Sequence, residues 1–96
     1  MNTIVALSTP RGRGALAIIR LSGVDAIAIA SRLGQLDEVE PRQATLTKLR
    51  RSKDDCVLDQ VLLTCFPSPH SLTGEDVVEI SCHGSPAIVR SIIDAI

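Results

Sequence analysis

The chain has 96 residues, of which 45% are hydrophobic and 22% charged, a composition typical of one globular domain that buries a core. Phe66 is its only aromatic residue, and the formal net charge is −1. This composition excludes a protein that binds single-stranded nucleic acid by stacking bases on aromatic side chains, and it gives no electrostatic footprint for a duplex. We expect one domain over residues 1–96, packed mainly with aliphatic side chains.

The cysteines and the N-terminus indicate the compartment. Cys56, Cys65 and Cys82 are odd in number and show no CxxC spacing, so we expect reduced thiols buried in the core or the sheet rather than a disulfide framework. The first residues contain neither a basic segment nor a long apolar stretch, which predicts no signal peptide and no membrane span. We therefore expect a cytoplasmic protein without membrane contact.

The first half of the chain predicts two strands and a helix. Thr3–Ser8 and Ala15–Leu21 are short and rich in β-branched residues, and a glycine-containing loop separates them. Ser22-Gly23-Val24-Asp25 has the S-x-x-[DE] form of a helix start. We expect the helix to continue to Leu33 and to end at Gly34 in the C′ position.

The second half predicts three strands and a second helix. The strands are Ala44–Arg50, Cys56–Phe66 and Glu75–Cys82, and the loop Pro67–Gly74 precedes the last one. The order ββαβββα predicts an α+β fold, a mixed sheet of about five strands with two helices.

The closing helix has the clearest start signal. Ser85 fits the N-cap and Pro86 fits the first helical position. One apolar face follows, made of Ile88, Val89, Ile92, Ile93 and Ile96. Because the chain stops on this face, we expect the domain to be truncated within its last helix.

One motif is misleading. Gly12-Arg13-Gly14-Ala15-Leu16-Ala17 fits the dinucleotide-binding pattern G-x-G-x-x-[G/A]. That mechanism requires the glycines to open a helix whose N–H groups hold the pyrophosphate. The segment after Gly14 is short and β-branched, which predicts a strand, so we reject a dinucleotide site.

Arg20 and Glu79 are the candidate binding residues. Strand alternation places Arg20 on the face of Leu16 and Ile18, and a charge on an apolar face requires a partner. Glu79 lies in the apolar strand Asp76–Ser81 and has the mirrored requirement. Two interpretations remain open from the residues alone: the two side chains pair with each other or with neighbours, or each faces a ligand.

The other reactive side chains predict neither a metal site nor a catalytic residue. Cys56, Cys65, His70, Cys82 and His83 lack the paired spacing of a zinc site. Adjacent residues such as Cys82 and His83 point to opposite faces of a strand, which also argues against a Cys–His nucleophile. No G-x-x-x-x-G-K-[ST] motif is present, so this chain is not itself a P-loop nucleotide hydrolase.

Several segments taken together resemble a known family. These are Thr3-Ile4-Val5-Ala6, Thr9-Pro10 with Gly12-Arg13-Gly14, Ile19-Arg20-Leu21-Ser22-Gly23, Phe66-Pro67-x-Pro69-x-Ser71-Leu72-Thr73-Gly74-Glu75-Asp76-Val77-Val78-Glu79 and His83-Gly84-Ser85-Pro86. In this order they closely resemble the N-terminal domain of the tRNA-modification GTPases MnmE or TrmE. The similarity covers nearly the whole chain and is weakest between Gly34 and Val57. Ser85 departs from the family, which often has glycine there.

The resemblance implies a dimerising domain that binds 5-formyl-tetrahydrofolate or a related one-carbon tetrahydrofolate, with a fold similar to aminomethyltransferase-type folate domains. It implies a parent GTPase that acts with the flavoprotein MnmG (GidA) to modify the wobble uridine of certain tRNAs by a carboxymethylaminomethyl-type reaction. GTP, Mg²⁺ and K⁺ belong in the family to a GTPase domain downstream of Ile96, and tRNA is not expected to bind strongly to this domain.

Position by position, Arg20 and Glu79 match the folate contacts of the family. A carboxylate such as Glu79 suits the adjacent N–H donors of a pterin ring, and Arg20 suits a carbonyl or carboxylate. The one-carbon chemistry would be that of the cofactor, so whether this fragment is itself an enzyme stays open. The glycine loop at 12–14 is a weaker candidate for lining the pocket. The alternative function is a dimerisation module with no functional ligand site.

Overall fold

The computed structural model describes residues 3–9 and 14–96. The elements are β1 (Ile4–Leu7), β2 (Leu16–Ser22), α1 (Ala26–Gly34), β3 (Thr45–Arg50), β4 (Val57–Phe66), β5 (Val77–His83) and α2 (Pro86–Ala95). Pro10 to Arg13, including Gly12 of the glycine motif, lie outside the described residues. The segment after Gly14 is strand β2 rather than a helix, as predicted, so the geometry of a dinucleotide fingerprint is not formed.

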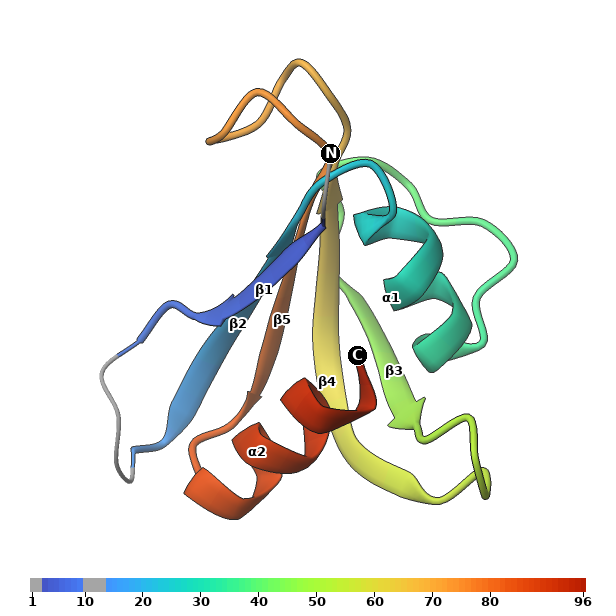
Figure 1. Ribbon diagram of the computed structural model, residues 1–96, viewed down its shortest axis with the longest axis vertical. Helices are drawn as coiled ribbons and strands as arrows, with labels where there is room; N and C mark the ends of the chain where they lie inside the picture. The colour runs from blue at the N-terminus through green and yellow to red at the C-terminus, as the bar shows by residue number, and fades with distance from the viewer. Residues whose placement is uncertain (1–2, 10–13) are drawn as a thin grey trace.

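The strands form one five-stranded sheet in the order β1-β2-β5-β4-β3 (Figure 1). The predicted α+β class and the order ββαβββα are confirmed. The sheet differs from the expected mixed sheet, because all four pairings between its strands are antiparallel. The physical reason is the connectivity: β1–β2, β3–β4 and β4–β5 are consecutive pairs in which the chain reverses. The segment that contains α1 leads from β2 to β3, which lies at the opposite edge of the sheet. The chain then returns through β4 to β5, which pairs with β2 in antiparallel orientation.

Both helices pack on one face of the sheet and form a single core with it (Figure 1). Alternate residues of each strand point into this core, as strand geometry requires. The largest fully buried side chains include Ile19, Leu21, Leu33, Leu49, Leu63, Ile80 and Ile92. Neither helix of the described segments has the length and apolar character needed to cross a bilayer.

Within residues 3–9 and 14–96, no helix covers the other face of the sheet. Its alternate positions include the exposed side chains of Ile4, Leu16, Leu46 and Leu62. We call this side of the sheet the open face. Arg20 and Glu79 lie on it, because they are displaced by an even number of residues from Leu16 and from Ser81, which pairs with Leu62.

The predicted start of α1 is wrong. Ser22 is the last residue of β2, and the N-cap is Asp25, which makes no capping hydrogen bond with its side chain. Gly23 turns the chain instead, with φ +143°, and any side chain there would collide with Thr3. The prediction fails because the Ser22 hydroxyl is bonded to a distant loop rather than to the helix.

The predicted end of α1 is displaced by one position. Gly34 is the last helical residue, and Gln35 takes the left-handed conformation with φ 53°. The carbonyl of Gly34 accepts a hydrogen bond from the Thr47 hydroxyl at 3.1 Å, which ties the helix end to β3. By contrast, α2 begins as predicted, with Ser85 at the N-cap, Pro86 in the first turn and the apolar face packed against the core.

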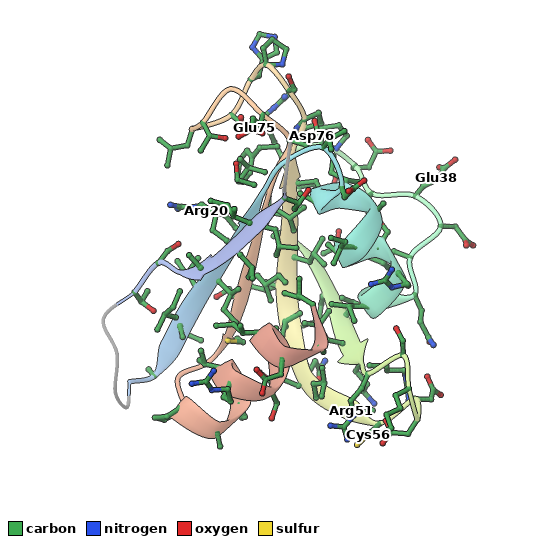
Figure 2. The ribbon with its side chains drawn as sticks, viewed as in Figure 1. Arg20, Glu38, Arg51, Cys56, Glu75 and Asp76 are labelled. Carbon is green, nitrogen blue, oxygen red and sulfur yellow. The ribbon has the colours of Figure 1, made fainter. Side chains whose placement is uncertain are left out.

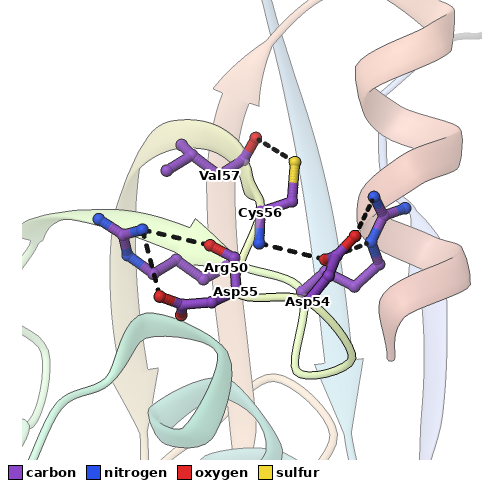
Figure 3. Close-up of polar contacts among 6 residues, drawn as sticks. Arg50, Asp54, Asp55, Cys56 and Val57 are labelled. Carbon is purple, nitrogen blue, oxygen red and sulfur yellow. Dashed lines mark hydrogen bonds and ion pairs between the residues drawn. The ribbon is translucent and has the colours of Figure 1, made fainter.

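The turn between β3 and β4 places Cys56 at the surface (Figure 3). Arg51 donates two hydrogen bonds to the Asp54 carboxylate, at 3.1 and 3.2 Å, and Asp54 also accepts the Cys56 N–H at 3.1 Å. These bonds hold the pKa of Asp54 below its ordinary value. The expectation that all three cysteines are core or sheet residues is therefore wrong for Cys56, because this tight turn ends before β4 enters the core.

Candidate functional site

Arg20 and Glu79 lie directly opposite each other on the neighbouring strands β2 and β5. The Nε atom of Arg20 donates to Oε2 of Glu79 at 3.0 Å, and Nη2 forms a second contact with the same oxygen. Figure 2 shows Arg20 pointing away from α1. The structure thus brings together the two residues that the sequence singled out, and it realises the interpretation in which they pair with each other.

The ion pair between Arg20 and Glu79 leaves hydrogen-bonding groups available to a ligand. The Arg20 and Glu79 side chains are 30% and 32% exposed, so both reach solvent. Both bonds from Arg20 go to Oε2, and no hydrogen bond to Oε1 is formed within residues 3–9 and 14–96. A carboxylate has acceptor positions on both oxygens, and a guanidinium has five N–H donors. A ligand with neighbouring donors and an acceptor can therefore contact the pair from the open face without first separating it.

The loop between β4 and β5 stands at one end of this site. The Ser22 and Thr73 hydroxyls are 2.8 Å apart and hydrogen-bonded, which fixes the loop to the end of β2. Asp76 accepts the Ser68 N–H at 2.8 Å, and the Ser68 hydroxyl donates to the Gly74 carbonyl at 2.9 Å. Figure 2 labels Glu75 and Asp76 in this region, at the opposite end of the molecule from α2. The S-L-T-G-E-D motif thus forms a loop with internal hydrogen bonds. It lies beside Ser22 and Val77, the next opposed pair of β2 and β5 after Arg20 and Glu79.

At the other end of the site, sequence reasoning missed a second polar pair. The Asp59 carboxylate accepts the backbone N–H of His83 at 2.9 Å and contacts its ring Nδ1 at 2.8 and 3.0 Å. The Asp59 side chain is only 9% exposed, whereas that of His83 is 66% exposed. One signal was available: Asp59 is the one charged residue of β4, a mainly apolar strand, and such a residue requires a partner.

His83 borders a shallow hollow of about 310 Å³, which is also lined by Gly14, Ala15, Gly84 and Ser85. Two backbone bonds hold its walls together: Gly14 N–H donates to the Gly84 carbonyl at 3.0 Å, and Gly84 N–H donates to the Ala15 carbonyl at 3.2 Å. Because Asp59 is bonded to Nδ1, the geometry leaves Nε2 of His83 as the ring nitrogen available to a ligand.

The remaining reactive side chains do not assemble into a site. Cys65 and Cys82 are buried, and burial raises the pKa of each thiol above 9.0, so both are held as neutral core side chains. The negative charge of Asp59 raises the pKa of Cys82 further. In the part of the chain that the structure describes, no three His, Cys, Asp or Glu side chains converge in a way that could hold a metal ion.

Comparison with known proteins shows similarity over nearly the whole chain, including the residues described above. The profile of the family described as "GTP-binding protein TrmE N-terminus" matches residues 3–96. A protein of Wolinella succinogenes named tRNA modification GTPase MnmE is 50% identical over 91 residues, which are 95% of this chain and 20% of that protein. Proteins of the same name from Legionella pneumophila (strain Corby) and a Sulfurovum species are 47% and 43% identical, over 97% and 99% of this chain and 21% of each relative.

The chain thus spans about a fifth of the length of these relatives. The match includes β2 with Arg20, the S-L-T-G-E-D loop and β5 with Glu79, which are the segments that build the site. The chain therefore belongs to the family described as GTP-binding protein TrmE N-terminus.

Proposed function

We propose that this domain binds a one-carbon tetrahydrofolate such as 5-formyl-tetrahydrofolate through Arg20 and Glu79. The observation that carries the proposal is the ion pair itself, which lies on the open face, reaches solvent and keeps one carboxylate oxygen clear of Arg20. The pterin ring offers adjacent N–H donors to a carboxylate and a carbonyl to a guanidinium. Arg20 and Glu79 would orient the cofactor, and the bound folate would supply the one-carbon chemistry.

The proposal extends to the assembly and its pathway. The open face carries exposed Ile4, Leu16, Leu46 and Leu62, an apolar surface that supports association with a second copy of the domain. The names of the relatives, tRNA modification GTPase, support a role in tRNA modification as part of a larger GTPase. In this proposal GTP, Mg²⁺ and K⁺ bind to a separate domain of that protein. In this scheme the protein is cytoplasmic, works with the flavoprotein MnmG and serves wobble-uridine modification, and the tRNA contacts other parts of the assembly.

Calorimetric titration of the full-length protein with 5-formyl-tetrahydrofolate tests the site. Arg20→Ala and Glu79→Gln each remove charge-assisted hydrogen bonds worth about 1.5–3 kcal/mol, so we expect affinity to fall at least tenfold. Arg90→Ala is the matched control, since Arg90 is an exposed arginine of α2 whose partner Asp94 lies 3.8 Å away. A folded Glu79→Gln variant with unchanged affinity would refute the site.

Light scattering tests dimerisation separately. We expect the mass of two chains for the wild type and for the Arg20 and Glu79 variants. A dimeric protein that gives no heat with the folate would support the alternative, a dimerisation module without a functional ligand site. A monomer that binds folate would instead refute the dimerisation part of the proposal.

A further inference from the structure

We draw no further inference here: the strongest candidate, the shallow hollow at the N-terminus of α2 beside the Asp59–His83 pair, lies at one end of the candidate site already described, and no buried, unpartnered polar side chain of the described residues points into it.

Discussion

Asp59 offers a direct test of how the end of β5 is held. Replacing it with alanine removes the acceptor of the His83 backbone N–H, 2.9 Å away, and the partner of the His83 ring. Hydrogen bonds to a charged group contribute about 1.5–3 kcal/mol, but His83 is exposed, and water can replace part of what is lost. We therefore expect the free energy of unfolding to fall by about 1–2 kcal/mol.

Urea unfolding followed by circular dichroism measures this change. Asp59→Asn keeps an amide oxygen for the backbone N–H but loses the charge, so its effect should lie between those of the wild type and the alanine variant. Asp94→Ala is the control, because Asp94 forms only an exposed ion pair at 3.8 Å, worth at most about 0.5 kcal/mol. If Asp59→Ala lowers the free energy of unfolding no more than Asp94→Ala does, Asp59 does not stabilise the end of β5 at His83, and our account of this pair is wrong.

Two further predictions concern the core and a close backbone approach. Burial raises the pKa of Cys65 and Cys82 above 9.0 in the folded protein, so the thiols of the unfolded chain ionise at a lower pH than those of the folded one. The free energy of unfolding is therefore unaffected by these thiols below pH 9 and falls as the pH rises above it. Unfolding at pH 8 and 10 should show this loss, which alanine at both positions reduces and Cys56→Ala leaves unchanged. Gly84→Ala would place a Cβ 2.2 Å from the Gly14 carbonyl oxygen, so thermal unfolding should show that the free energy of unfolding falls by about 1–3 kcal/mol. Gly14→Ala is the control and should cost much less, because the nearest atom to its new Cβ is 3.6 Å away. Equal effects of the two substitutions would contradict the close approach of Gly84 to Gly14.

Local signals explain what the sequence alone could predict. The start of α2 depends on Ser85 and Pro86, which are adjacent to the helix that they begin, and its apolar face is a periodic pattern. The five strands are likewise runs of β-branched and aliphatic residues between turns, so their positions were predicted within one or two residues. Arg20 and Glu79 were identifiable because each places a charge within an apolar strand.

The features that were mispredicted or missed depend on residues far apart in the chain. Ser22 has the sequence signature of a helix cap, but its hydroxyl is bonded to Thr73, 51 residues away. Asp59 and His83 are 24 residues apart and meet only because β4 and β5 are neighbours. The all-antiparallel sheet also depends on a long-range feature, because the segment that contains α1 leads from β2 to β3 at the far edge of the sheet. No local pattern contains such contacts, because they are produced by the topology.

The central position of β5 has a consequence for how the domain is assembled. The β1–β2 and β3–β4 ladders are hairpins of neighbouring segments, and a two-stranded hairpin alone is marginally stable in water. Strand β5, which follows the other strands of this sheet in chain order, lies between them and completes the continuous sheet on which both helices pack. A nascent chain that ends before Val77 therefore holds two unjoined hairpins, and the addition of seven residues, Val77–His83, converts them into one cooperative unit.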